Sequence, residues 1–449
     1  MITSTIGRIF LDAYNKKYGT NYDAKTFFVE VYHPLFFDSN KYLQWVQNSP
    51  FVQMEQKKGQ KVENLTSEER KEKLQVFLKK VDDCITPDAS FAPGYPASEE
   101  KEFATTSGQV TNLDFPLVQE DVFLSWIGSS LGIGLQGGLS ILFSTSEILL
   151  DIFEGWKLYR TALNEMPLLK GNQVNTWNGQ WLAHRYDKGF YVDQPMADFS
   201  PYETTKDGLS IATQSWTKVL VGIARQYSSP KMMGYVYNLG QTNTTIGFIP
   251  FNLEHIRRPI ELYQRLFGEN EGRKAEKLWG TEKGLRVCCQ KGAIGIEAMQ
   301  PKGLKQYMTA DKDKAVKLPK YKDGDTEQTI NYHTYQIWLL AMLNNEELWT
   351  KSQEFAKTLQ TYVNKDKKLS TKRGNLVKNI LSCTSKKTFL FALSEIASDI
   401  ESFNTIEENA KIIHMMPADN VPYYLTLIRF HYAGLSNKNN QQALQLEFN

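Results

Sequence analysis

Side-chain amides next to glycine are the residues of this sequence best suited to recognising another molecule. They gather around Gln109 and Asn112, along the run from Gly171 to Gln180, and in Gln241, Thr242 and Asn243. Amides can pair with base edges, and glycine lets a backbone approach a duplex closely. Asn and Gly also favour ordinary turns, which is the commoner explanation for any single cluster. Because three clusters fall in one region, we predict that a DNA motif is read by Gln109, Asn175, Asn178, Gln241, Thr242 and Asn243.

A second stretch of the sequence is rich in lysine and could bind another molecule through its charge. Between positions 365 and 387 the chain carries Lys365, Lys367, Lys368, Lys372, Arg373, Lys378, Lys386 and Lys387. In a helix, Lys378 would point away from the apolar face of Ile380 and Leu381 and would face solvent. Flexible point charges suit phosphate contact without sequence reading, although a solvated helix surface explains them equally well. The predicted phosphate contacts are Lys372, Arg373, Lys378, Lys386 and Lys387.

Patterns for catalysis and cofactor binding are weak. Gly132, Gly134 and Gly137 match GxGxxG, and Glu154 lies near the spacing of a ribose-binding acid. No clear βαβ unit follows, so close packing of a glycine-rich segment is the favoured interpretation. GxxxxGK[ST] and HExxH do not occur, and the histidines and cysteines lack metal-ligand spacing. Glu297 and a nearby lysine match a metal-dependent nuclease only loosely. We therefore expect no enzyme activity, no cofactor and no metal.

Size and composition favour a folded protein with more than one domain. The chain has 449 residues, of which 41% are hydrophobic and 23% charged, and its net charge is only +2. Single cores rarely grow beyond roughly 250–300 residues, so two or three domains are expected. Because the overall charge is near zero, any nucleic-acid site must come from local patches.

The apolar segments of the sequence do not favour a membrane protein. The first residues lack the apolar core of a signal peptide. The uncharged segment 123–146 is long enough to span a bilayer, but its glycine, serine and glutamine make it too polar for a confident span. We expect a cytoplasmic protein with no membrane contact.

The secondary structure expected to position these residues changes along the chain. The first hundred residues look helical, with a capping box at Thr66 and Glu69. The middle of the chain looks β-rich with helices between, and hairpins are predicted for 234–251 and 286–299. Residues 302–325 are rich in lysine, and we expect them to form a mobile linker.

From about residue 326 onward the apolar spacing is helical throughout, which indicates a bundle of short amphipathic helices. The charge of this part is uneven, since residues 351–390 are basic and residues 391–420 acidic. We therefore predict an α+β fold, with an irregular mixed N-terminal region with β-hairpins over 1–325 and a C-terminal helical bundle over 326–449.

A series of phrases then follows in a recognisable order. They are GYVYNLG from Gly234, QTNTTIGF from Gln241, the segment from Glu254 into the helix after Pro259, RGNLVK from Arg373, and KKTF from Lys386. Taken together they resemble the large subunit of type I-B CRISPR surveillance complexes (Cascade). The resemblance covers most of the chain and is one of organisation, because no phrase is diagnostic alone.

The resemblance implies a non-catalytic subunit of antiviral defence. Its N-terminal part would touch the guide-RNA end and read the short motif beside the target (the PAM), and its helical bundle would line the opened DNA. Guide pairing reads the rest of the target sequence. The implied partners are guide RNA, double-stranded DNA, other Cascade subunits and a recruited helicase-nuclease or other effector. A restriction-type metal-dependent nuclease and a protein-binding scaffold remain as alternatives.

Overall fold

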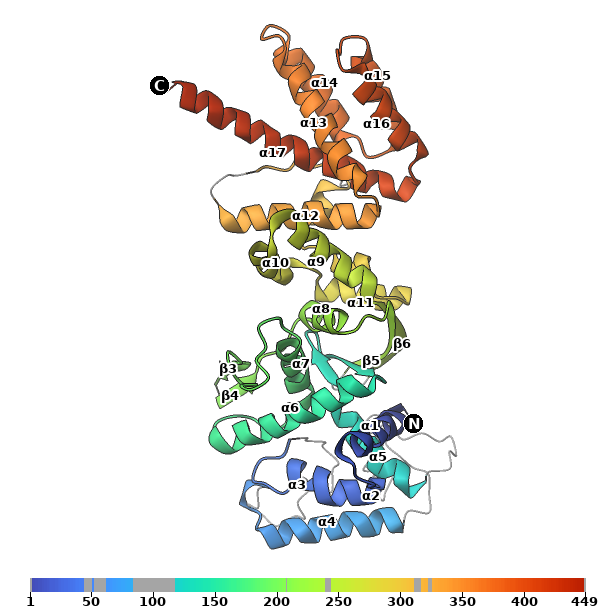
Figure 1. Ribbon diagram of the computed structural model, residues 1–449, viewed down its shortest axis with the longest axis vertical. Helices are drawn as coiled ribbons and strands as arrows, with labels where there is room; N and C mark the ends of the chain where they lie inside the picture. The colour runs from blue at the N-terminus through green and yellow to red at the C-terminus, as the bar shows by residue number, and fades with distance from the viewer. Residues whose placement is uncertain are drawn as a thin grey trace. The chain divides into compact units, whose positions relative to one another are not determined.

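The computed structural model of the chain describes residues 2–43, 51, 62–83, 118–206, 208–238, 244–310, 316–321 and 325–447. It divides into two compact units, Met1–Leu253 with Cys289–Ala293, and Glu254–Cys288 with Ile294–Asn449 (Figure 1). The elements up to the boundary are α1 (Ile2–Tyr18), α2 (Ala24–Phe27), the π-helical turn η1 (Phe28–Tyr32), α3 (His33–Phe36), η2 (Val62–Asn64), α4 (Ser67–Asp82), α5 (Gln119–Ser130), β1 (Ile133–Leu135), β2 (Leu139–Phe143), α6 (Ser146–Glu165), α7 (Val174–Arg185), β3 (Tyr202–Thr205), β4 (Gly208–Ile211), α8 (Trp216–Gln226), β5 (Lys231–Asn238) and β6 (Thr244–Asn252).

The chain continues through short helices into a series of longer ones. These elements are α9 (Leu253–Phe267), α10 (Glu269–Ala275), η4 (Glu276–Leu278), α11 (Glu282–Lys291), η5 (Ile296–Met299), η6 (Leu304–Tyr307), α12 (Thr326–Leu343), α13 (Glu347–Asn364), α14 (Ser370–Ser382), α15 (Lys386–Ala397), α16 (Phe403–Met415), η7 (Ala418–Asn420) and α17 (Val421–Glu447). The predicted α+β fold with a helical C-terminal bundle is confirmed.

Two glycines allow α1 and α5 to pack with their backbones nearly in contact. A Cβ on Gly7 would lie 2.0 Å from the Leu124 carbonyl oxygen, and a Cβ on Gly128 would lie 1.9 Å from the Thr3 carbonyl oxygen. The hydroxyls of Thr3 and Ser125 share a hydrogen bond of 2.5 Å across the same interface. Any larger side chain at either glycine would push the helices apart.

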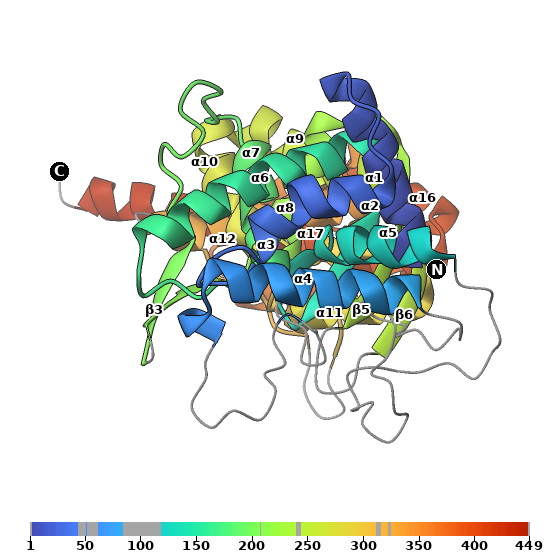
Figure 2. The ribbon, with the colours of Figure 1, turned by 90° about the horizontal axis from the view of Figure 1, so that it is seen from below.

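An aromatic core joins α4 to these helices. α4 packs beside α5 (Figure 2) and begins with the predicted capping box, which Thr66 and Glu69 form through reciprocal side-chain hydrogen bonds. Phe77 of α4 is buried, and its ring lies 5.2 Å from that of Phe28 and 5.8 Å from that of Trp126. Burial of such large rings supplies much of the hydrophobic stabilisation of this region.

The main sheet is antiparallel, with strand order β1-β2-β5-β6. The GxGxxG pattern falls in the β1–β2 hairpin, where Gly137 and Gly138 adopt φ values of 84° and 70° that glycine tolerates. A Cβ on Gly134 would lie 2.8 Å from the Asn175 backbone, so the glycine allows α7 to pack against β1. The pattern therefore builds a hairpin and a close helix contact, and no helix begins at it as a dinucleotide site requires.

The uncharged segment 123–146 forms most of α5 and the β1–β2 hairpin. Within the described part of the chain, no helix combines the length and the apolar character needed to cross a membrane.

The hairpin predicted for 234–251 is present as β5 and β6, which pair from Lys231↔Asn252 to Asn238↔Thr244. The hairpin predicted for 286–299 is wrong, because this segment forms α11 and the turn η5. The buried residues of α11 are Leu285, Cys288 and Cys289, which have the spacing of one helix face.

The lysine-rich stretch predicted to be a linker is anchored where the structure describes it. Leu304 is fully buried, and the Tyr335 hydroxyl donates to the Lys302 carbonyl at 2.8 Å. The Tyr307 carbonyl accepts from Arg429 of α17 at 2.8 Å. Residues 254–288 and 294–310 thus fall in the same compact unit as the C-terminal helices, whereas the sequence predicts a boundary near 325.

α12 is the central helix of the second unit. Its residues from Gln336 to Ala341 are all buried, so it is covered on every side. α17 packs against α12 and α13, while α13–α14 and α15–α16 form two helical hairpins (Figure 1). Arg429 of α17 is buried, and its guanidinium donates to the carbonyls of Leu381 and Cys383 at 2.5 Å each.

Candidate nucleic-acid interface

The strongest feature predicted from sequence, the basic stretch, lies on α14 and at the neighbouring ends of α13 and α15. Five of its lysines are exposed and make no ion pair among the described residues. We call these the lysine surface, which consists of Lys367, Lys368, Lys372, Lys378 and Lys387. It contains three of the five predicted phosphate contacts, and all three keep a free ammonium group in solvent.

Arg373 does not belong to this surface, contrary to the prediction. It is only 5% exposed, and its guanidinium donates to the Asp399 carboxylate at 2.9 and 3.1 Å. The guanidinium also lies over the Tyr362 ring, 4.7 Å from the centroid. Arg373 shares a helix face with the buried Val377 and is therefore turned inward. The hydrogen bonds from Arg373 lower the pKa of Asp399.

Lys386 is also engaged, because its ammonium donates to the His414 carbonyl at 2.9 Å. A cation at the last turn of α16 is favourable for the helix dipole. Acids that follow α15 neutralise other cations: Lys365 pairs with Glu401 at 2.6 Å and Lys351 pairs with Glu408 at 2.8 Å. The acidic half of the bundle thus folds back onto part of the basic half, while the lysine surface keeps its five charges without an ion pair among the described residues.

Asn178, predicted to read DNA, is a buried structural residue. It is fully buried on α7, where its amide nitrogen donates to the carbonyls of Ser130 and Gly132 at 2.8 Å each. Its amide oxygen accepts from the Trp156 indole at 3.1 Å. Each of these contacts lies inside the unit, so Asn178 cannot meet a base edge without unfolding.

Asn175 is half-buried one turn earlier on α7. Its amide nitrogen lies 3.4 Å from the Ser140 hydroxyl and 3.4 Å from the Tyr237 hydroxyl, which places it against the sheet. Burial raises the pKa of Tyr237 to about 12. The remaining amide candidates, Gln109, Gln241, Thr242 and Asn243, lie outside the described residues.

The β5–β6 hairpin carries an aromatic pair that sequence reasoning did not single out. Tyr235 and Phe248 are directly opposed across the strands, with ring centroids 5.3 Å apart. Phe248 is 63% exposed, and Tyr235 stacks on Tyr237 at 5.8 Å. The alternation along 232–238, which buries Gly234 and Val236 and leaves Tyr235 outward, is the signal that could have found it.

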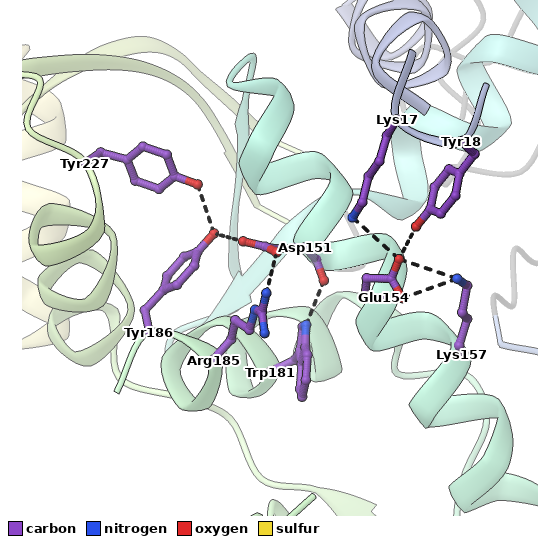
Figure 3. A network of polar contacts seen from close by, with 9 residues as sticks. All are labelled: Lys17, Tyr18, Asp151, Glu154, Lys157, Trp181, Arg185, Tyr186 and Tyr227. Atoms are coloured by element: carbon purple, nitrogen blue, oxygen red, sulfur yellow. Dashed lines mark hydrogen bonds and ion pairs between the residues drawn. The ribbon is translucent and has the colours of Figure 1, made fainter. Parts of the chain in front are cut away.

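Two carboxylates of α6, Glu154 and Asp151, gather polar partners from neighbouring elements of the first unit (Figure 3). Glu154 accepts from the Tyr18 hydroxyl and pairs with Lys157 at 3.2 Å and with Lys17 at 3.7 Å. Burial alone would raise the pKa of Glu154, but the hydrogen bond from Tyr18 and the two lysines outweigh it and lower the pKa. Glu154 therefore ties α6 to α1 and is not a ribose ligand.

The second carboxylate, Asp151, lies one turn before Glu154 on α6 and has a different set of partners in Figure 3. It accepts from the Tyr186 hydroxyl at 2.8 Å and pairs with Arg185 at 3.4 Å. Tyr186 in turn lies 3.2 Å from the Tyr227 hydroxyl, and burial followed by the charge of Asp151 raises the pKa of Tyr186. The network joins α6 to α7 and to the end of α8, which is a structural task.

Glu297, the acid weighed for a nuclease, lies in the 3-10 turn η5 and is exposed. In the described part of the chain, no group of three or more His, Cys, Asp and Glu side chains is placed to hold a metal ion. Comparison of the chain with protein-family models, curated proteins and solved structures finds no match.

Proposed function

We propose that this chain is a nucleic-acid-binding large subunit of a CRISPR RNA-guided surveillance complex. The observation that carries the proposal is the lysine surface. Two other cations of the same stretch, Arg373 and Lys365, are held by Asp399 and Glu401, whereas the lysine surface keeps its charge in solvent. Unpaired lysines grouped on one helix and its neighbours are suited to phosphate, since each contact releases condensed counterions.

The lysine surface would hold a strand without reading it. Lysine is a flexible point charge, and phosphate contacts fix position while carrying no sequence information. In the proposed complex, pairing with the guide RNA reads the target. The guide RNA, the double-stranded DNA target, the other Cascade subunits and a recruited helicase-nuclease are the proposed partners.

The β5–β6 hairpin is proposed to supply the contact with the target-flanking motif. The amides Gln241 and Asn243 lie in its connection, and amides are the side chains that pair with adenine edges. The exposed ring of Phe248, beside the half-buried Tyr235, offers a face on which an unstacked base can rest. Replacing Gln241 and Asn243 with Ala is expected to reduce sequence preference while salt-dependent affinity is kept.

The direct test compares two triple variants of the full-length protein. Lys372→Gln, Lys378→Gln and Lys387→Gln remove three charges from the lysine surface, and Lys351→Gln, Lys365→Gln and Lys411→Gln remove three ion-paired charges. We expect the first variant to lose affinity for labelled single-stranded RNA and duplex DNA alike and to co-purify with less RNA. The second should stay near the wild type. An equal loss of affinity in both variants would show that binding depends only on the net charge of the protein, and would contradict the proposal.

A protein-binding scaffold is the second candidate, because large apolar side chains are exposed on the helices next to the lysine surface. Phe391 is 69% exposed and Met415 is 82% exposed. Exposed apolar residues of this size mark protein contacts when they form a patch. Wild-type protein that binds neither RNA nor DNA in the test above would favour this candidate.

A further inference from the structure

The second unit contains a cavity of about 470 Å³ between α12, α13 and α17, with one wall from the end of α9. This volume lies in the range of small-molecule sites, roughly 300–1,000 Å³. Five aromatic rings line it: Phe267, Tyr321, Tyr332, Trp349 and Phe430. The cavity lies outside the lysine surface, and nothing proposed so far uses it.

The walls of the cavity are planar rings held in place before any ligand arrives. Phe267 and His333 stack with centroids 3.7 Å apart and an interplanar angle of 6°. His333 is fixed from behind, because its Nδ1 lies 2.6 Å from the Glu271 carboxylate, which also accepts from the Tyr263 hydroxyl at 2.7 Å. Trp349 stands edge to face with both Phe267 and His431. Rings fixed in this way lose little freedom on binding a flat ligand.

The floor of the cavity is polar but uncharged. Gln336 and His431 are 4% and 7% exposed, and the Gln336 amide nitrogen lies 3.2 Å from His431 Nδ1. Burial lowers the pKa of His431 to about 3, so the ring is neutral at physiological pH. Since the amide nitrogen donates to Nδ1, the ring proton lies on Nε2, and this atom has no hydrogen-bond partner among the described residues. A neutral amide and imidazole suit an uncharged ligand with ring nitrogens and carbonyl groups.

The rim of the cavity is hydrophilic and lies on α13. Gln353, Glu354 and Lys357 are exposed there, and Lys357 makes no ion pair in the described part of the chain. A free ammonium at the mouth of an aromatic cavity can meet a phosphate attached to a ring bound inside.

We infer that this cavity binds a single nucleobase. The ring faces supply stacking, Gln336 and Gln353 supply hydrogen bonds to the base edge, and Lys357 supplies a phosphate contact. The base can come from a free nucleotide or from an unstacked position in a single strand. The inference goes beyond the proposed function, because a free nucleotide would bind whether or not the lysine surface holds a strand.

The experiment uses the full-length protein and two kinds of probe. Calorimetry with AMP, GMP, CMP and UMP measures free nucleotides. Fluorescence anisotropy compares a labelled single-stranded RNA with the same strand in which the bases are removed. Binding of a mononucleotide assigns the free source, and a loss of affinity on base removal assigns the strand source.

Two variants on the cavity accompany these probes. Trp349→Leu removes a stacking ring, and Gln353→Ala changes an exposed rim residue with little risk to the fold. Loss of one stacking partner is expected to weaken base-dependent binding about 5- to 150-fold. Lys411→Gln on α16, which pairs with Glu407, is the matched control and should bind as the wild type does.

Two results would overturn the inference. In the first, no mononucleotide binds and removal of the bases leaves the affinity for the strand unchanged. In the second, base-dependent binding is found but neither cavity variant weakens it. This outcome is separate from failure of the proposed function, which the lysine variants test. A protein whose affinity depends on the lysine surface alone would keep the proposed function and lose the nucleobase site. Thermal melting of each variant shows whether weaker binding comes from a folding defect.

Discussion

At the scale of single residues, position on the helix decides which cations are free to bind. Lys372 and Arg373 are adjacent in sequence, yet the first is exposed and the second is buried against Asp399 and Tyr362. Arg373 lies four residues before the buried Val377, a spacing that places both on one face. The four-residue spacing of Arg373 and Val377 can be read from the sequence. A prediction based only on the local density of charge does not take it into account.

Replacing Arg373 with Gln should therefore act on stability, while replacing Lys372 with Gln should act on binding. Arg373→Gln removes the guanidinium that donates to the Asp399 carboxylate and the Tyr362 carbonyl, and we expect a lower melting temperature. Lys372→Gln is a surface change, expected to alter the free energy of unfolding by no more than about 0.5 kcal/mol. Thermal denaturation of both variants checks this, and equal melting temperatures would contradict the inward placement of Arg373.

Buried histidines make stability depend on pH. Burial lowers the pKa of His33 to about 4 and that of His431 to about 3, whereas the unfolded value is about 6.5. Between these values the unfolded chain binds protons that the folded chain does not, so stability is full above about pH 6.5 and falls as pH decreases. Each histidine contributes a slope of up to about 1.4 kcal/mol per pH unit.

Urea denaturation from pH 7 to pH 5 measures this slope. His431→Gln should make it shallower than in the wild type, whereas His255→Gln, at an exposed position of α9, should leave it unchanged. If His431→Gln has the same slope of stability against pH as the wild type, the lowered pKa of His431 is contradicted.

At the scale of elements, the sequence predicts best where one periodicity dominates. The β5–β6 hairpin and the helices after 326 were predictable because alternation and helical spacing run without interruption. The hairpin predicted for 286–299 is wrong because short apolar runs around Cys288 and Cys289 fit a strand as well as a helix face. The cavity was not predictable, since Phe267, Trp349 and Phe430 come from three separate helices that only the tertiary fold unites.

Glycine gives a sharp test at this scale, because the same substitution should have opposite effects at two sites. Gly7→Ala would place a methyl group 2.0 Å from the Leu124 carbonyl oxygen and force α1 from α5. Gly374→Ala on α14 meets nothing within 4 Å, and should stabilise the helix by about 0.5–1 kcal/mol. Chemical denaturation should show lower stability for the first and higher stability for the second, and a tolerated Gly7→Ala would mean that α1 and α5 pack less closely.

At the scale of the whole molecule, the two compact units divide at Leu253, whereas the sequence pattern predicts a division at 325. α12 explains the difference, since it is buried on all sides and partly covered by residues that precede it. The Trp338 indole donates to the Ile296 carbonyl at 2.9 Å, and Phe267 stacks on His333. A change from a mixed to a helical sequence pattern marks where the long helices begin. It does not show which earlier residues pack on these helices and belong to the same unit.

Two fragments distinguish these boundaries. Residues 254–449 retain the cover of α12 and should fold, with a cooperative thermal transition by circular dichroism. Residues 326–449 lack α9, α10 and η5, so the buried face around Trp338 would meet water and the transition should no longer be cooperative. A cooperative transition in the shorter fragment would return the boundary to 325.

The central claim is that the lysine surface binds phosphate, and the salt dependence of nucleic-acid affinity tests it most directly. The logarithm of the association constant should fall linearly with the logarithm of salt concentration for the wild type. For Lys372→Gln, Lys378→Gln and Lys387→Gln together, the slope should be shallower by about 0.7–0.9 for each phosphate that the variant no longer neutralises, or about 2.1–2.7 for three phosphates. The control variant at Lys351, Lys365 and Lys411 should keep the wild-type slope. A slope that is the same in all three proteins would contradict the claim.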